Sequence, residues 1–145
     1  MRKNKTVAKI LELKDNRKKE IELEVKRAAD REETEKTRLK ALEKDYMDIR
    51  ECFSENHGEG PLDINKLVSY YDFFSRINGK IDEQKKVHTE CQNKLECLKD
   101  SLVHAHQEKR MFEIIRDKAL KTERKENLKS EQKENDFIAL SRRIK

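Results

Sequence analysis

Histidines and cysteines are the side chains of this sequence best suited to bind a metal or to act as nucleophiles. His88 lies three residues before Cys91, and Cys97 lies seven residues before His104. On a helix, residues seven apart are separated by about 10 Å, too far to converge on one zinc ion. We therefore predict no metal site, with His88 and Cys91 packed between helices and His104 and His106 on the surface.

Enzyme chemistry has no other candidate residues in this chain. The sequence has no Gly-rich phosphate loop, no Walker-type lysine and no Cys-His or Ser-His grouping in a plausible cleft. Its many carboxylates are expected on solvated ridges, where nothing would shift a pKa toward general acid-base work. We predict a protein that is not an enzyme and binds no cofactor.

The composition restricts which elements could position any site. Of the 145 residues, 34% are hydrophobic, 45% are charged and none is Trp, so a globular core is not expected. Such a composition is also typical of disorder. However, residues 1–57 contain neither Gly nor Pro, and residues 62–145 contain only Gly79, which favours long helices.

A 3.5-residue repeat of apolar positions runs through the first half of the chain. Stepping by four and three predicts a helix from about residue 6 to residue 54 and a seam that faces a partner helix. The seam positions are Val7, Leu11, Lys14, Lys18, Ile21, Val25, Ala28, Glu32, Glu35, Leu39, Leu42, Tyr46, Ile49 and Phe53.

Residues 55–62 hold the only Pro and two of the three Gly, so they are predicted as a turn. Asp63 is the expected N-cap of a second helix over about 63–140, with Leu62 and Leu67 packed across the cap. The expected seam of this helix comprises Ile64, Leu67, Tyr71, Phe74, Ile77, Ile81, Gln84, His88, Cys91, Leu95, Leu98, Leu102, Ala105, Lys109, Phe112, Arg116 and Ala119.

One irregularity interrupts this second repeat. The repeat has two consecutive steps of three residues, from Tyr71 to Phe74 and from Phe74 to Ile77, which predict that the helix is locally overwound. The adjacent Asn78-Gly79 allows a kink in the helix. We favour a continuous helix over a break.

A short turn between long helices makes them antiparallel, with opposite residue numbers summing to about 117. This places Glu32 and Glu35 opposite Asp82, Lys85 and Lys86, and ends the paired part of the second helix near residue 111. Residues 112–145 would form an overhang. The predicted fold is all-α: one domain over residues 1–145, a long antiparallel two-helix coiled-coil hairpin with a C-terminal helical overhang.

Charge is unevenly distributed along the chain. Residues 1–19 carry eight basic and two acidic side chains, residues 108–145 twelve and eight, and the stretch between them fifteen and twenty. In a hairpin the two ends share one pole, which would be basic. Few aromatic residues are interleaved with these charges, so protein docking is favoured over nucleic-acid binding, with a merely solvated surface as the alternative.

Residues 67–81 contain more apolar residues than one seam can use. With the seam assigned as above, Val68, Tyr70 and Phe73 would lie on neighbouring faces and Ile77 at the edge. An exposed aromatic stripe on a charged helix is typical of a docking site. The alternative is that these residues simply cover the turn.

The start of the chain is charged and contains no apolar run of signal-peptide or membrane-spanning length, which predicts a cytosolic protein. Three cysteines are an odd number, and the hairpin would place Cys52 far from Cys91 and Cys97. We expect free thiols.

The sequence resembles the FliJ family, the small coiled-coil component of the bacterial flagellar export apparatus. The similar features are Ile10-Leu11-Glu12-Leu13-Lys14, a Gly-containing turn, and Tyr70, Phe73, Ile77 and Ile81 in their spacing after it. The aromatic residue that often precedes the family's opening motif is absent here.

The resemblance implies a stalk-like monomer in flagellar protein export and motility. Its terminal end would enter the export ATPase hexamer, and it would contact the cytoplasmic domain of the export gate and escort export chaperones, reaching the membrane only through these partners. The implied gate residues are Tyr70, Phe73, Ile77 and Gln84. The cations expected to contact the ATPase ring are Lys3, Lys5, Lys9, Arg110, Arg116, Lys118, Lys121, Arg124 and Lys125.

Three other functions remain open from the sequence, one of them a basic nucleic-acid-binding protein. The same fold would serve as the equivalent stalk of a virulence type III secretion system, or as a generic coiled-coil scaffold or homodimeric spacer.

Overall fold

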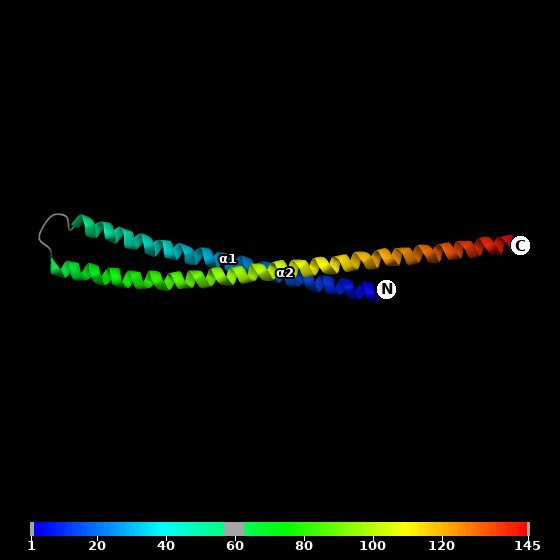
Figure 1. The fold of residues 1–145 in the computed structure, drawn as a ribbon, viewed down its shortest axis with the longest axis horizontal. Coiled ribbons are helices and arrows are strands. Elements are labelled where there is room, and N and C mark those ends of the chain that lie inside the picture. The colour runs from blue at the N-terminus through cyan, green and yellow to red at the C-terminus, as the bar shows by residue number, and fades with distance from the viewer. Residues whose placement is uncertain (1, 57–62, 145) are drawn as a thin grey trace. The chain divides into compact units, whose positions relative to one another are not determined.

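The computed structural model describes residues 2–56 and 63–144. It contains helix α1 over Arg2–Asn56 and helix α2 over Ile64–Ile144 (Figure 1). The predicted turn falls almost wholly outside the described residues, as does Leu62 of the predicted hydrophobic contact across the cap. The fold class is as predicted: all-α, with two long helices packed against each other as a hairpin.

The beginning of α2 has the expected N-cap. One carboxylate oxygen of Asp63, Oδ1, accepts a hydrogen bond from the backbone N–H of Asn65 at 3.1 Å, and its carbonyl oxygen accepts one from the N–H of Leu67 at 3.0 Å. The side-chain bond satisfies an N–H group of the first turn that has no partner within the helix, and the carbonyl bond is the first regular bond of the helix. From there α2 runs without a break through Asn78 and Gly79, so the continuous helix is confirmed.

The chain divides into two compact units, each built from one segment of α1 and one of α2. Unit 1 comprises Met1–Ile21 and Ser101–Lys145, and unit 2 comprises Glu22–Asp100. Unit 1 carries 20 basic and 11 acidic side chains, whereas unit 2 carries 15 basic and 19 acidic ones. The predicted separation of charge along the sequence therefore coincides with the division into units.

Burial along α1 follows the predicted seam closely. All fourteen seam positions are buried or half-buried, including the polar ones. An uninterrupted 3.5-residue repeat keeps one stripe of a helix against its partner, which explains why the pattern was sufficient here.

The seam of α2 agrees with the prediction except at Ile64, Leu67, Tyr71 and Arg116, which are exposed. The errors at Ile64 and Tyr71 share one cause, whereas Leu67 lies on the seam in either phase and is exposed near the start of α2. Counting back from Ile81 in unbroken steps of four and three gives Ile77, Phe74 and Tyr70, and Tyr70 is the ring that turns inward. The predicted overwinding is therefore wrong. The repeat is regular, and Tyr70, rather than the predicted Tyr71, is the seam residue.

The helices pair in a register shifted from the predicted one. In unit 2, Glu35 contacts Gln84 and Glu32 contacts His88, so the paired numbers sum to 119 and 120. In unit 1, Lys14 contacts Glu108 and Asn4 contacts Glu123, giving sums of 122 and 127. The predicted sum of 117 placed the turn too early, because α1 extends to Asn56 and α2 begins only at Ile64.

The overhang begins later than predicted. The Asn4 amide donates to the Glu123 carboxylate, so α2 is paired well beyond residue 111. From Arg124 to Ile144 every residue is exposed, yet the helix continues.

Candidate interaction surfaces

The residues predicted to contact the export gate all lie on α2 within unit 2, but they do not share one accessible face. Tyr70 is half-buried and packs edge-on against Phe53, with ring centroids 5.2 Å apart. Phe73 is also half-buried, 6.3 Å from the ring of Phe74. Both line a shallow hollow of about 460 Å³ whose other walls are Ile49, Asn65, Lys66 and Ser69.

The other two predicted gate residues face α1. Ile77 is only 6% exposed and belongs to the core, which corrects its predicted place at the edge of a docking stripe. The Gln84 amide donates to the Glu35 carboxylate at 2.5 Å and to the Glu35 carbonyl at 3.0 Å. Tyr70 and Phe73 are thus the members of this set that a partner can reach in part, while Ile77 and Gln84 hold the helices together.

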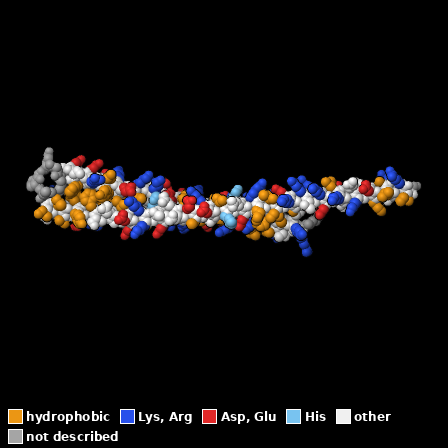
Figure 2. All heavy atoms as spheres, in the orientation of Figure 1, with side chains coloured by type: hydrophobic (Ala, Val, Ile, Leu, Met, Phe, Trp, Pro, Cys, Tyr) orange, Lys and Arg blue, Asp and Glu red, His pale blue; other side chains and the backbone are white. Residues whose placement is uncertain are grey.

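An apolar stripe that the sequence analysis did not assign lies on the first two turns of α2. Its members are spaced at i, i+3, i+4 and i+7 and are all exposed: Ile64, Leu67, Val68 and Tyr71, the last at 73%. This spacing puts them on one face of the helix. The predicted seam contains Ile64 and Tyr71 because it uses Tyr71 in place of Tyr70, and it contains Leu67 in either phase. Figure 2 shows hydrophobic side chains gathered where α1 ends and α2 begins.

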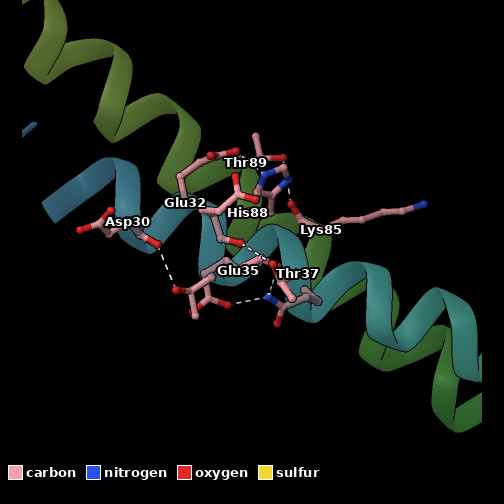
Figure 3. A network of polar contacts seen from close by, with 10 residues as sticks. Asp30, Glu32, Glu35, Thr37, Lys85, His88 and Thr89 are labelled. Carbon is pink, nitrogen blue, oxygen red and sulfur yellow. Dashed lines mark hydrogen bonds and ion pairs between the residues drawn. The ribbon is translucent and has the colours of Figure 1, made fainter. Parts of the chain in front are cut away.

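A polar layer interrupts the apolar seam of unit 2 (Figure 3). The Glu32 carboxylate lies 2.8 Å from Nε2 of His88, and the carboxylate of Glu35, a buried residue, accepts from Gln84 and from Arg38, the latter at 3.0 Å. The predicted partners of these two glutamates, at positions 82, 85 and 86, are all exposed. The layer forms, but with seam residues.

A groove of about 570 Å³ crosses unit 2 next to this layer. Buried Cys91 is among its lining residues, the others being Glu24, Arg27, Ala28, Arg31, Val87, Glu90, Lys94 and Leu98. All three cysteines are free thiols, with Cys52 and Cys97 exposed. Its charged lining residues are three cations and two carboxylates, so its charge favours no particular ligand.

The nine cations predicted to contact the ATPase ring all lie in unit 1 and are all exposed. We call them the basic surface: Lys3, Lys5, Lys9, Arg110, Arg116, Lys118, Lys121, Arg124 and Lys125. Arg110 forms an ion pair with Glu113 at 3.1 Å on its own helix. The structure thus gathers this predicted set in one unit.

Two reciprocal ion pairs join the helices of unit 1, and the predicted register missed both. Lys14 lies 2.8 Å from Glu108, and Lys109 lies 2.7 Å from Asp15. The hydrogen bond from Lys109, and secondarily that from Lys19, lowers the pKa of Asp15 below its ordinary value. The hydrogen bond from Lys14 likewise lowers the pKa of Glu108. The pairs give two seam lysines a partner across the interface.

Residues 2–56 and 63–144 contain neither a metal-binding cluster nor a membrane-spanning stretch. Within residues 2–56 and 63–144, no cluster of three or more His, Cys, Asp or Glu side chains could hold a metal ion. In the described part of the chain, neither helix has a stretch apolar enough to cross a bilayer. His104, predicted at the surface, is exposed and lies 3.6 Å from Glu108.

Comparison with known proteins gives one match. The family model described as "Flagellar FliJ protein" matches residues 4–145, nearly the whole chain. Neither the curated proteins nor the solved structures contain a match to this sequence. The match covers both units described above and agrees with the resemblance seen in the opening and post-turn motifs. The chain belongs to the FliJ family of flagellar proteins.

Proposed function

We propose that this protein is a non-catalytic docking component of flagellar type III protein export, located in the cytoplasm and held at the membrane only through its partners. Membership of the FliJ family carries the proposal, because it makes the chain a component related to flagellar export. Two separate surfaces support it: the basic surface belongs to unit 1 and the aromatic hollow to unit 2, so the two proposed contacts use different residues.

The basic surface is proposed to bind the export ATPase ring. Unit 1 has nine more basic than acidic side chains, and the nine cations that form the surface are exposed. A group of exposed cations attracts an acidic partner at distances up to about one Debye length, and this attraction raises the rate of association.

Charge reversal tests this assignment against a matched control. K118E/K121E changes the net charge of unit 1 by the same amount that K85E/K86E changes the net charge of unit 2, and all four lysines are exposed. We expect the first variant to reduce stimulation of the cognate export ATPase by about ten-fold or more, and the second to leave it within about two-fold. Equal losses in both variants would reject the basic surface as the ring contact.

The hollow beside Phe73 is proposed to bind the cytoplasmic domain of the export gate, and this surface is also proposed to serve the export chaperones. Tyr70 and Phe73 line this hollow, and aromatic side chains in pockets frequently dominate binding energy. Of the four residues implied by the resemblance, Ile77 and Gln84 act indirectly, by fixing the segment that presents the rings.

Calorimetric titration of the gate domain with three variants decides between the hollow and the exposed stripe. F73A should weaken binding about ten-fold, while V103A, an exposed apolar residue of unit 1, should not change it. Y71A probes the stripe. Binding lost in Y71A and retained in F73A would transfer the gate contact from the hollow to the stripe.

A further inference from the structure

One face of α2 in unit 1 carries no carboxylate. Alternating steps of three and four residues keep a row on one side of a helix. Here the row turned away from the seam is His104, Gln107, Met111, Ile114, Lys118, Lys121, Lys125, Leu128, Gln132, Asn135, Ala139 and Arg142. All of these side chains are exposed. Residues 104–142 contain eight acidic side chains, and every one of them lies on another face of the helix.

The same row has a different composition in unit 2. Continued toward the start of α2 in the same steps, it contains four carboxylates: Asp72, Glu83, Glu90 and Asp100. A face that is merely solvated needs no such segregation, because interspersed charges of both signs keep a surface soluble. The lack of carboxylates is therefore particular to unit 1, which is also the unit that carries the basic surface.

The middle of the row combines apolar and basic side chains. Met111 and Ile114 precede three lysines, and Leu128 follows them, all three apolar residues being exposed. We call this segment the outer face: Met111, Ile114, Lys118, Lys121, Lys125 and Leu128. It is about 26 Å long at 1.5 Å per residue, and in Figure 1 it lies in the yellow and orange part of α2.

The three lysines of the outer face differ from other cations of the basic surface. Within residues 2–56 and 63–144, no carboxylate forms an ion pair with any of them, whereas Arg110 is paired with Glu113 and Arg116 lies 3.7 Å from Asp117. On α1, the row through Lys5 and Lys9 continues one turn later with Glu12. The outer face is thus where neighbouring cations add their attraction for an acidic surface without an opposing charge between them.

The mixture of side chains distinguishes a protein partner from lipid and from nucleic acid. A helix that lies on a bilayer has its apolar side chains on one face and its cations on the other. Here the lysines stand between apolar side chains on the same face, so lipid could not cover Met111, Ile114 and Leu128 without desolvating the lysines. The outer face also has no aromatic side chain on which a base could stack. A protein surface can match both its charges and its apolar side chains.

We infer that the outer face is the part of the basic surface that meets the export ATPase ring, and that the ring receives it with carboxylates set between two apolar patches. This inference rests on the proposed function and narrows it. Of the nine cations, Lys118, Lys121 and Lys125 make the contact, and Met111, Ile114 and Leu128 join them as apolar anchors.

Two charge reversals within unit 1 test the lysines. K121E/K125E and K5E/K9E each replace two exposed lysines of the basic surface and change the net charge of unit 1 by the same amount. Stimulation of the cognate export ATPase is measured over a range of concentrations of the full-length chain. K121E/K125E should raise the concentration for half-maximal stimulation about ten-fold or more, and K5E/K9E should raise it less than about three-fold.

M111Q/I114Q tests the apolar side chains without changing the charge. L13Q/V103Q is its matched control, because Leu13 and Val103 are exposed apolar residues of unit 1 outside the outer face. M111Q/I114Q should raise the half-maximal concentration about five-fold or more at low and at moderate salt alike, whereas K121E/K125E should reduce the dependence on salt. All replaced side chains are exposed, so circular dichroism should be unchanged in the four variants.

Three results would overturn the assignment of the outer face. Equal losses in K121E/K125E and K5E/K9E would do so while leaving a ring contact in unit 1, and so would unchanged stimulation in M111Q/I114Q. Binding to phosphatidylglycerol vesicles that M111Q/I114Q abolishes, with unchanged ATPase stimulation, would assign the face to lipid. Equal losses in K118E/K121E and K85E/K86E would reject the ring contact itself, so failure of the outer face and failure of the proposed function are distinguishable.

Discussion

The polar layer of unit 2 should reduce stability while it fixes the register of the two helices. Glu35 is a buried residue whose carboxylate side chain is 9% exposed, and it lies in a seam that is otherwise mostly apolar. Replacing it together with Gln84 by leucine, as E35L/Q84L, removes both partners of the hydrogen bond at once. The helices then have a more uniform apolar seam, which allows more than one alignment.

The magnitude follows from the contacts of the pair. A hydrogen bond to a charged group contributes about 1.5–3 kcal/mol net, while burying two leucine side chains contributes about 1.5–3 kcal/mol each. The Arg38 pair adds about 0.5 kcal/mol or less, because its guanidinium is 65% exposed. We expect E35L/Q84L to be more stable than the wild type by about 1–3 kcal/mol. E35A alone removes the bond without adding burial and should be less stable by about 1–2 kcal/mol.

Two measurements separate stability from register. Urea unfolding followed by circular dichroism gives the free energy of unfolding. For register, A28C is introduced together with C52S and C97S, leaving native Cys91 as its only possible disulfide partner. Residues 28 and 91 line one groove, and their residue numbers sum to 119, as do those of the paired Glu35 and Gln84. With the polar layer intact, oxidation should cross-link the helices nearly completely.

The same cross-link in the E35L/Q84L background gives the decisive comparison. We expect a partial cross-link there, because slipped alignments move position 28 away from Cys91. A variant that is more stable and still cross-links completely would refute the register role. A variant that is less stable than the wild type would show that the polar pair stabilises the fold by more than leucines can replace.

Three further expectations follow from single sites. I77A should lower the free energy of unfolding by about 2 kcal/mol in a urea titration, because Ile77 is 6% exposed; no loss would contradict its place in the core. G79A should raise it by up to about 1 kcal/mol, since an added Cβ meets no atom within 4 Å; a decrease would argue against the continuous helix. Asp15 and Glu108 have pKa values below the ordinary 3.8 and 4.5 in the folded chain. Their ion pairs therefore stabilise unit 1 fully at a pH above these ordinary values, and the stabilisation is lost as the pH falls through the lowered pKa values. Thermal melts between about pH 6 and pH 3 should show this decline, and D15N/E108Q should flatten it.

The sequence was sufficient to assign α1 because its repeat allows a single reading. From Val7 to Phe53 the steps of four and three never break, and even Lys14, Glu32 and Glu35 lie where the repeat puts them. Phase, rather than the hydrophobicity of each residue, decides which face of a long helix is covered.

The start of α2 was misassigned because two tyrosines are adjacent and equally suitable for a seam. Tyr71 was placed inward at the cost of an irregular repeat, whereas Tyr70 preserves the phase set by Phe74 and Ile77. The ring that turns inward is the one that meets Phe53, and that contact depends on the pairing of the helices. An unbroken repeat is the available signal: it takes Ile64 and Tyr71 out of the seam, but it keeps Leu67 there although Leu67 is exposed.

The partners of the polar residues could not be predicted from charge alone. Glu32 and Glu35 were matched to lysines of opposite charge, but a long lysine side chain on an adjacent face stays in water, where its charge is well solvated. The seam positions across from the glutamates hold Gln84 and His88, which are short enough to donate within the interface. The correct partners follow only once the sum of the paired residue numbers is known to within one residue.

The two units fix their register by chemistries that respond differently to salt. Unit 2 uses Glu35 and His88, whose side chains are 9% and 14% exposed, whereas the ion pair between Lys14 and Glu108 in unit 1 is 34% and 39% exposed. Screening acts mainly on accessible charges, so added salt should weaken the pairing of unit 1 before that of unit 2. Unit 1 also carries the basic surface, and salt therefore weakens both the proposed ring contact and the segment that presents it. A salt titration of ATPase stimulation thus measures the ring contact alone only up to the salt concentration at which the helicity of the wild-type chain begins to fall. D15N/E108Q, which lacks the ion pairs, is the control and should show a smaller response of helicity to salt.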